Sequence, residues 1–486
     1  MLKRRLGRLL VLSICLNGCA WMPKQADDFR TMIGLSPPQT SVNMPTPLTW
    51  QAPLPHAGKL TTLNAWWQQF NDPLLLRLID AAQIVSPSIA TAKSHIEQAR
   101  AKQVSADAAL LPDVNANASI NKGLESLFFP AATISSIGLA THWELDLFGG
   151  NQAAQDAAQA RFTGATAAWH DARVLVAAEV ANQYNSLRSC EAQVAFAQTD
   201  ANSRTETAHL TEEMTRAGFQ TPANTALAKA SAAQAASTLI SQSARCTLAV
   251  KALVALTGMD EVRLQQQLQL ARGKLAEPLT IHVAAVPAEA LAQRPDIFVA
   301  AYDVIANSAD ITQLQAQRYP KISFSGKISA MHMEIAATPQ GGTVWSIGPL
   351  AVTLPLFDGG LRTANVSAAR ARYDEASMIY AGKLRNAVRE VEEALINLRS
   401  MEQRRIEVQK AVEGFNTAFN AKEALYKVGL ANLLELEDTR RTTVQAQNIL
   451  LDLQREHIAA WISLYRALGG GWEAASTDTV FKQAPR

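Results

Sequence analysis

Apolar and polar residues alternate strictly over a short run that follows Pro112. In residues 113–121 the even positions from Val114 to Ile120 are apolar and the odd positions are polar, and residues 321–329 after Pro320 alternate in the same way. Each run has about the nine to eleven residues that a tilted strand needs to cross a bilayer. A half-buried strand of a soluble sheet gives the same pattern, so one run alone does not decide between the two.

Each alternating run is followed by a second expected strand that returns. The second returning strand is less regular than the first, because Leu350, Val352 and Leu354 fall on the side expected to face inward and Pro349 interrupts it. The expected strands span about 113–122, 137–148, 321–330 and 345–356.

Long segments without proline follow both strand pairs. Residues 150–218 and 360–429 contain no Pro, and a continuous helix of about 65 residues rises roughly 100 Å. Shorter helical segments, 222–256 and 430–468, run back after a glycine at each turn. We therefore expect two long helical hairpins with coiled-coil packing.

The chain repeats this order of elements after about 210 residues. The matching segments are Ser86–Ile89 with Arg294–Ile297, Leu147–Gly150 with Leu356–Gly360, and Arg216–Gly218 with Lys427–Gly429. The internal duplication predicts an α+β chain in which each half supplies one strand pair and one helical hairpin.

The amino terminus has the features of an export signal. Basic residues precede the apolar run Leu9–Leu16, which is too short to span a membrane, and Asn17-Gly18-Cys19 follows. We expect cleavage before Cys19 and a covalent lipid on this residue, with Ala20 disfavouring retention in the inner membrane. The alternative is an ordinary signal peptide with a chance cysteine.

Composition excludes several classes of protein. The net charge is +2 with 18% charged residues and no block of like charge, so nucleic acid is a poor partner. No uninterrupted run of eighteen apolar residues follows the signal, so we expect no transmembrane helix. Paired-His zinc helices, glycine-flanked nucleophilic serines and phosphate loops are also missing from the sequence, so the chain is not expected to be an enzyme or to hold a cofactor other than the lipid.

Two further groups of residues carry chemistry. Cys190 and Cys246 lie 28 residues before and after Gly218, hence at one height on neighbouring helices, and in an oxidising compartment we expect a disulfide. Two free buried thiols are the alternative. Soft ligands in Met331–Met333, expected in an outer loop, would suit copper or silver, but a cluster without a ligand is favoured and no metal site is predicted.

Four strands cannot close a barrel, because about eight is the smallest number whose interior accommodates side chains. The chain must therefore assemble with copies of itself: two give eight strands and a filled interior, and three give twelve and room for water. The polar positions expected to line this lumen are Asn115, Asn117, Ser119, Ser323, Ser325 and Lys327. The positions expected to face lipid are Val114, Ile120, Ile322, Phe324 and Ile328.

From Trp66 to Trp472 the sequence resembles the TolC family of outer-membrane channels, in its OprM- and CusC-like lipoprotein branch. The most specific segments are Leu354–Gly360, Ala292–Asp296 and the two glycine turns. The resemblance implies a homotrimer in which a twelve-stranded outer-membrane barrel continues into a long α-helical periplasmic barrel. It implies the exit duct of a tripartite efflux system, with a periplasmic adaptor and an inner-membrane pump of the resistance-nodulation-division type as partners.

The resemblance also implies an organisation and site residues. The expected divisions are 1–18 signal peptide, 19–65 lipidated extended strap, 66–258 first repeat, 259–290 equatorial linker, 291–470 second repeat and 471–486 tail. The adaptor-contact tips correspond to Arg216, Gly218, Lys427 and Gly429.

A periplasmic gate corresponds to Glu435 and Asp438, which share a helix face. A solvated helix face, to which Glu437 and Arg440 would also belong, is the alternative. The family's gate-closing Arg is replaced by Ala431. The alternatives for function are the exit channel of a type I protein secretion system and a non-conducting structural periplasmic lipoprotein.

Overall fold

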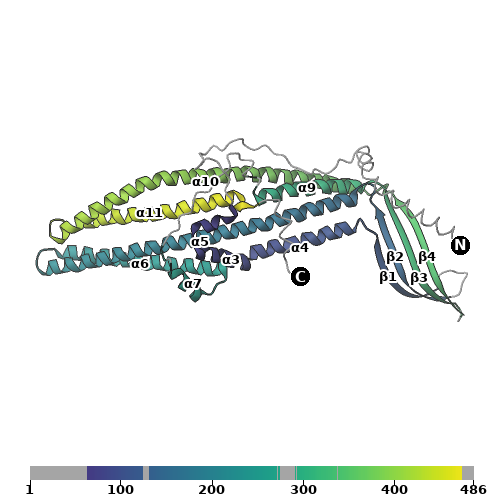
Figure 1. The fold of residues 1–486 in the computed structure, drawn as a ribbon, viewed down its shortest axis with the longest axis horizontal. Helices are drawn as coiled ribbons and strands as arrows, with labels where there is room; N and C mark the ends of the chain where they lie inside the picture. Colours follow the sequence, from purple (N-terminus) through teal and green to yellow (C-terminus); the bar gives the residue numbers. More distant parts are fainter. Residues whose placement is uncertain are drawn as a thin grey trace. The chain divides into compact units, whose positions relative to one another are not determined.

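The computed structural model describes residues 63–123, 131–270, 272–273, 291, 293–335 and 338–472. These residues divide between two compact units, one containing 94–166 and 299–381 and the other 63–93, 167–298 and 382–472. The first unit contains the strands, and the second contains the helical hairpin tips (Figure 1). The signal peptide, Cys19 and nearly all of the expected strap and tail lie outside the described residues.

The element lengths repeat closely between the two halves. The first half contains η1 (Leu63–Phe70), α3 (Pro73–Val85), α4 (Pro87–Ala108), β1 (Asp113–Gly123), β2 (Ala132–Leu145), α5 (Gly150–Arg216) and α6 (Pro222–Thr257). After α7 (Glu261–Gln269), the second half contains α9 (Pro295–Ala316), β3 (Lys321–Ile335), β4 (Thr338–Thr353), α10 (Leu361–Lys427), α11 (Leu433–Ala467) and η2 (Gly469–Gly471). Helices α4 and α9 both have 22 residues, and α5 and α10 both have 67.

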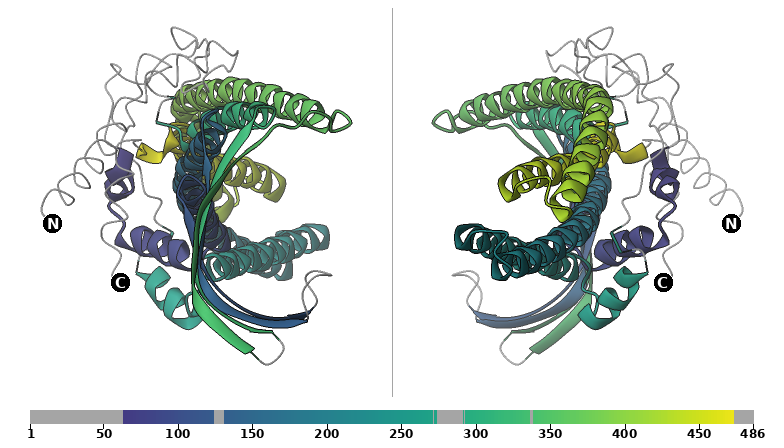
Figure 2. Two further views of the ribbon diagram at one scale, coloured as in Figure 1. Left: turned by 90° about the vertical axis from the view of Figure 1, so that its right-hand side faces the viewer. Right: turned by 90° about the vertical axis from the view of Figure 1, so that its left-hand side faces the viewer.

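The four strands form one antiparallel sheet in the order β1-β2-β3-β4, and the sheet is curved (Figure 2). Strand β2 begins five residues earlier than expected, and β3 and β4 extend until only residues 336 and 337 separate them. The sequence between Ile328 and Ile335 contains no Gly, Pro, Asn or Asp, which explains why pairing continues there.

The irregular returning strand is explained by a β-bulge. Phe324 pairs with Leu350 while Gly326 pairs with Ile347, so β4 advances three residues where β3 advances two. The extra residue exchanges the two faces of β4 at Gly348 and Pro349. Leu350 and Val352 therefore lie on the same face as Trp345 and Ile347, and the expectation that they point inward was wrong.

The two faces of the sheet differ sharply in polarity. Large apolar side chains are exposed over one face, including Ile120 (77%), Trp345 (67%) and Val352 (63%). The register places polar positions such as Asn117 and Ser329 on the other face. An exposed apolar surface of this kind marks a site of contact with lipid or protein.

The two long helices end in the same motif. Gly218 (φ 81°) and Gly429 (φ 79°) take the left-handed conformation that glycine allows. The N–H of Phe219 donates to the Met214 carbonyl at 2.8 Å, and the N–H of Leu430 donates to the carbonyl five residues earlier at 2.9 Å, which is the Schellman pattern. The next helices are capped by Thr221 and Asn432, three residues after each glycine.

Aromatic residues form a core where η1 meets α11. Trp66 is fully buried and stacks on Tyr465 with ring centroids 4.8 Å apart, and Trp67 and Phe70 pack against it. Face-offset and edge contacts of this kind add to the energy of burial. The cluster fixes the start of the described chain to the second helical hairpin.

Among the described helices, α6 is long and apolar enough to cross a membrane by length and composition, and α3 with α4 passes when the bent pair is counted as one span. The sequence expectation of no such helix rested on uninterrupted apolar runs, which serine and threonine break in α6. One helix of this kind is weak support for a span, because helices packed in a bundle have the same composition.

Candidate functional site

The polar face of the sheet encloses an open hollow of about 740 Å³. Its lining includes four of the residues expected in a lumen, Asn115, Asn117, Ser325 and Lys327. Ser323 lies on the same face, since it pairs with Glu144 and Ala351. The register thus gathers onto one surface residues that lie more than 200 positions apart in the chain.

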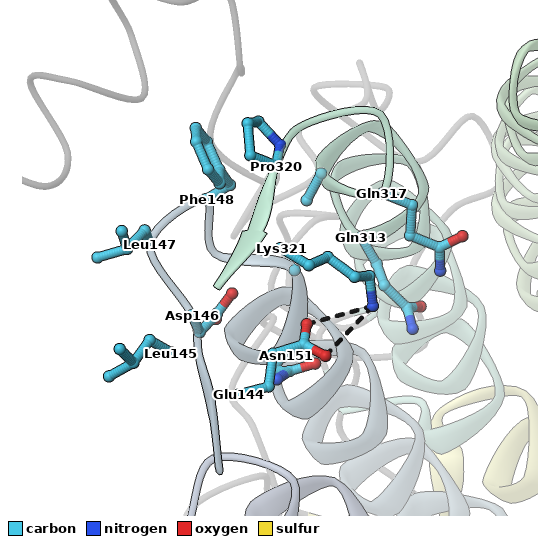
Figure 3. A pocket seen from close by; sticks show the side chains of 12 residues that line it. Glu144, Leu145, Asp146, Leu147, Phe148, Asn151, Gln313, Gln317, Pro320 and Lys321 are labelled. Carbon is cyan, nitrogen blue, oxygen red and sulfur yellow. Dashed lines mark hydrogen bonds and ion pairs between the residues drawn. The ribbon is translucent and has the colours of Figure 1, made fainter. Parts of the chain in front are cut away.

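Charged residues gather at the end of the sheet that leads into the helices. The ammonium of Lys321 lies 3.2 and 3.3 Å from the two carboxylate oxygens of Glu144 (Figure 3). A small cavity of about 50 Å³ lies beside this pair and includes Asp146 in its lining. Asp146 accepts a hydrogen bond of 2.8 Å from the N–H of Gln152 and so satisfies a donor in the first turn of α5.

The Met331–Met333 cluster lies within β3 and not in the outer loop where it was expected. Successive strand residues point to opposite faces, so His332 lies on the face opposite to Met331 and Met333. Its backbone pairs with Ser135, whereas the backbone of Met331 pairs with Ser136. The three side chains do not converge, and the part of the chain that the structure describes contains no group of three metal-ligating His, Cys, Asp or Glu residues.

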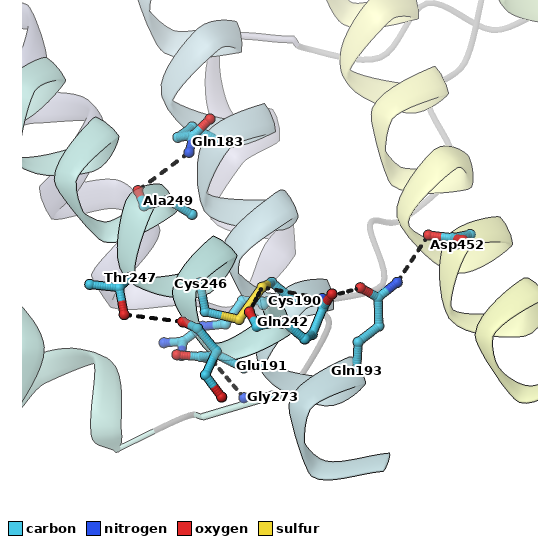
Figure 4. The surroundings of a disulfide bond; sticks show 12 residues. Gln183, Cys190, Glu191, Gln193, Gln242, Cys246, Thr247, Ala249, Gly273 and Asp452 are labelled. Carbon is cyan, nitrogen blue, oxygen red and sulfur yellow. Dashed lines mark hydrogen bonds and ion pairs between the residues drawn. A yellow bond between two sulfur atoms is a disulfide. The ribbon is translucent and has the colours of Figure 1, made fainter. Parts of the chain in front are cut away.

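A disulfide joins α5 to α6 at the pair expected from the sequence. Cys190 and Cys246 are bonded, with their Cα atoms 5.6 Å apart (Figure 4). Side-chain amides continue across the helices: Gln242 donates to Gln193 at 2.6 Å, and Gln193 donates to Asp452 of α11 at 3.0 Å. The bond therefore lies in a polar layer that also reaches the second hairpin.

The two carboxylates expected at the gate are exposed, and each has a cationic partner in its own chain. Glu435 accepts a hydrogen bond of 2.9 Å from Lys422, which lowers the pKa of its carboxyl, and another from the Asn432 amide at 2.8 Å. Asp438 lies 2.7 Å from Arg441, and both side chains are mostly exposed. Within one chain, each negative charge is therefore partly balanced.

A buried ionic cluster lies on the face of α11 adjacent to the exposed face of Glu435 and Asp438. The sequence analysis did not predict this cluster. Glu437 binds Arg440 of its own helix, Arg204 of α5 at 2.9 Å and the Ser231 hydroxyl of α6 at 2.6 Å. The Arg440 side chain is only 2% exposed and donates to Ser203 at 3.1 Å. The alternative that placed Glu437 and Arg440 on a solvated helix face is therefore wrong for these two residues.

The helix tips expose the turn residues that the resemblance assigned to adaptor contact. Arg216 pairs with Glu212 and Glu213 at 3.0 and 2.8 Å, and Lys427 pairs with Glu423 at 3.3 Å. No heavy atom would lie within 4 Å of a Cβ added at either turn glycine, so the tips have open space around them. Large apolar side chains there are also exposed, namely Phe219, Val428 and Leu430.

Comparison with known proteins gives the same assignment along most of the chain. A family model described as outer membrane efflux protein matches residues 78–259 and 286–470. The outer membrane protein OprJ of Pseudomonas aeruginosa is 30% identical over 425 residues, covering 86% of this chain and 88% of OprJ. The cation efflux system protein CusC of Escherichia coli is 25% identical and covers 84% of this chain and 89% of CusC.

A solved structure shows the same fold. The outer membrane protein VceC of Vibrio cholerae superimposes with a TM-score of 0.74 at 26% identity, covering 85% of this chain and all of that one. The relatives of the present chain are outer-membrane channels of Gram-negative bacteria and not enzymes. The repeat, the two-faced sheet and these similarities together show that the chain belongs to the outer membrane efflux protein family.

Proposed function

We propose that three copies of this chain form the exit duct of a tripartite efflux system that exports small toxic compounds. The observation that carries the proposal is the four-stranded sheet with one apolar and one polar face. Four strands leave two open edges and cannot close. Three sheets joined edge to edge give twelve strands, an apolar surface toward lipid and a polar lumen.

Lipid attachment at Cys19 and the division into two repeats, 66–258 and 291–470, are parts of the same proposal. The signal-like segment before Cys19 supports acylation, and the equal lengths of α5 and α10 support the repeat boundaries. A Cys19→Ser variant is expected to lose labelling by radioactive palmitate. Labelling that survives this change would exclude the anchor.

The helix tips are proposed to contact a periplasmic adaptor, which in turn reaches an inner-membrane pump. The identical Schellman turns at Gly218 and Gly429, with Arg216 and Lys427 in the preceding helical turn, offer two similar exposed surfaces per chain. Three chains then present six such surfaces, which suits a ring of adaptor subunits. Glu435 and Asp438 are proposed to surround the narrow end of the duct.

Two measurements test the proposed duct. Deletion of the gene is expected to increase sensitivity to part of a panel of antibiotics, aromatic acids, copper and silver, and the intact gene should restore resistance. The purified protein is expected to migrate as a heat-modifiable trimer and to conduct ions in planar bilayers. A protein that forms no trimer and conducts no current would be a structural lipoprotein, and the proposal would fail.

A further inference from the structure

We propose that Lys327 is a specificity-determining residue of the duct, and that it favours the passage of organic anions such as carboxylates and phenolates. The inference rests on the proposed channel function, because Lys327 meets a solute only if the polar face lines a lumen. Its basis is the arrangement of charge on that face of the sheet.

Lys327 stands in a row of neutral neighbours. The register across the four strands is Asn115, Ala140, Lys327 and Ser346. Along β3, Ser325 and Ser329 are the adjacent residues on the same face. The Lys327 side chain makes no hydrogen bond or ion pair with the described residues, and it is exposed beside the 740 Å³ hollow. Its ammonium is therefore available to a passing solute.

The other charges on this face are engaged by the protein itself. Glu144 is paired with Lys321. Asp113 accepts from the His142 N–H at 2.8 Å through one oxygen and from the Asn115 amide at 2.7 Å through the other. His142 stands opposite Asp113 in the row below that of Lys327, and its Nδ1 is 3.3 Å from the Ser325 hydroxyl of the same row.

Distance separates Lys327 from the nearest carboxylate on the polar face. Asp113 is two strands away and one row lower, which places the two backbone positions roughly 12 Å apart. This exceeds the Debye length of about 8 Å at physiological ionic strength. In a water-filled lumen Lys327 therefore sets the local potential at its own level.

Beyond Lys327 the polar face carries no further charge as far as the described strands extend. The remaining pairs are neutral, for example Asn117 with Gly138 and Ser119 with Ser136. Threefold assembly would place three Lys327 ammonium groups at one height, as the last fixed charges before the outer end of the strands. Rings of like-charged side chains are a recognised basis of pore selectivity.

The test is the reversal potential of single trimers under a KCl gradient, measured in a Glu435→Gln/Asp438→Asn background so that the helix tips contribute little. Lys327→Gln is expected to lower the chloride-to-potassium permeability ratio about two- to fivefold, and Lys327→Glu to lower it further. The matched control is Lys122→Gln, which removes an equal charge from the opposite face. A ratio that Lys327→Gln leaves unchanged would overturn the proposal.

A second variant avoids dependence on folding. Lys327→Cys is modified in the open channel with thiosulfonate reagents that add either a trimethylammonium or a sulfonate group. The cationic group should restore anion preference, and the anionic group should reverse it. Sodium benzoate serves as an organic-anion probe and should reduce the current of the parent more than that of Lys327→Gln. Equal effects of both reagents, or equal benzoate effects, would contradict the inference, whereas a parent that conducts no current would contradict the channel function itself.

Discussion

The first helical hairpin, α5 with α6, and the second, α10 with α11, share one backbone plan but are held by different chemistry. Both have a 67-residue outgoing helix, a Schellman turn and a side-chain N-cap three residues after the turn glycine. Helix α6 contains three charged residues and α11 contains nine. The first hairpin has the disulfide between Cys190 and Cys246. The turn glycines are 211 residues apart, and at this offset the second hairpin has Met401 and His457 in place of the two cysteines.

The two copies of the duplicated hairpin differ in the contacts that hold their returning helices, α6 and α11. The disulfide and the packing of alanines such as Ala208 and Ala228 join α6 to α5, with a partly exposed ion pair between Lys229 and Glu212 beside them. Helix α11 instead binds α5 through buried ionic groups, while its exposed carboxylates Glu435 and Asp438 pair with cations of their own hairpin. The first hairpin is therefore the fixed element of the pair, and the second is the one whose position depends on electrostatics.

The largest expected effect comes from the buried ionic cluster. Glu437→Gln leaves the buried Arg440 without its carboxylate, and an uncompensated buried charge costs about 3–5 kcal/mol. The thermal midpoint of the solubilised protein should fall, with proteolysis beginning at the second tip. Glu407→Gln is the control, because Glu407 and its partner Lys410 are both exposed. Equal midpoints for the two variants would show that the cluster contributes nothing to stability.

Loss of the disulfide is expected to have the next largest effect. Cys246→Ser should cost about 2–4 kcal/mol, since the bond closes a segment with a sequence separation of 56 residues. Hydrogen exchange should increase in α6 while α11 stays protected. The parent protein, alkylated at its free thiols, should differ in mass depending on whether it was first treated with reductant. Identical masses of the parent with and without reductant would contradict the disulfide. Hydrogen exchange that rises equally in both hairpins of the variant would contradict a stabilising effect confined to the first hairpin.

A buried histidine makes the stability of the first repeat depend on pH through a group that the second repeat lacks at the equivalent position. Burial, and then the charge of Arg173, lower the pKa of His170 from 6.5 to about 4, and the equivalent position on α10 is Ala381. A lowered histidine pKa favours the neutral form in the folded state, so stability is full above pH 6.5 and falls as the pH drops toward 4. After allowance for solvent screening, the loss should be about 1–2 kcal/mol.

The variant His170→Gln isolates this effect. Burial raises the pKa of the neighbouring Asp171, which shifts stability in the opposite direction on acidification. Asp171 is unchanged in the variant, so the difference between the two pH profiles reports the imidazole alone. Thermal midpoints at pH 7 and pH 4.5 supply the profiles. Parallel profiles for the parent and the variant would rule out His170 as the source.

Local patterns predicted most of the fold, and long-range packing accounts for what they missed. Residue alternation and missing proline predicted the strands and the 67-residue helices, because both depend on nearest neighbours along the chain. The faces of β4 could not be predicted, since the bulge at Gly348 is visible only against the register of β3. The predicted strand ended at about residue 330, five residues before the observed end of β3 at Ile335.

The candidate site was predictable in part for the same reason. The residues of the polar face follow from strand alternation, and the disulfide follows from equal distances to Gly218. The burial of Glu437 and Arg440 could not be read from α11, because Glu435 and Asp438 have the same chemistry on an adjacent face. The approach of α5, which brings Arg204 and Ser203, and of α6, which brings Ser231, distinguishes the buried pair from the exposed one.

The smallest effect on stability, and the sharpest on function, is expected at the tips. The Glu435→Gln/Asp438→Asn variant should fold as the parent does, because both carboxylates are exposed, but the potassium-to-chloride permeability ratio of its channels should fall. The control is Glu213→Gln, which removes an exposed, arginine-paired carboxylate from the first tip. If the gate belongs to the second hairpin alone, the control leaves the reversal potential unchanged. Equal shifts in both variants would mean that the two tips share the constriction, and an unchanged potential in the double variant would remove both carboxylates from the gate.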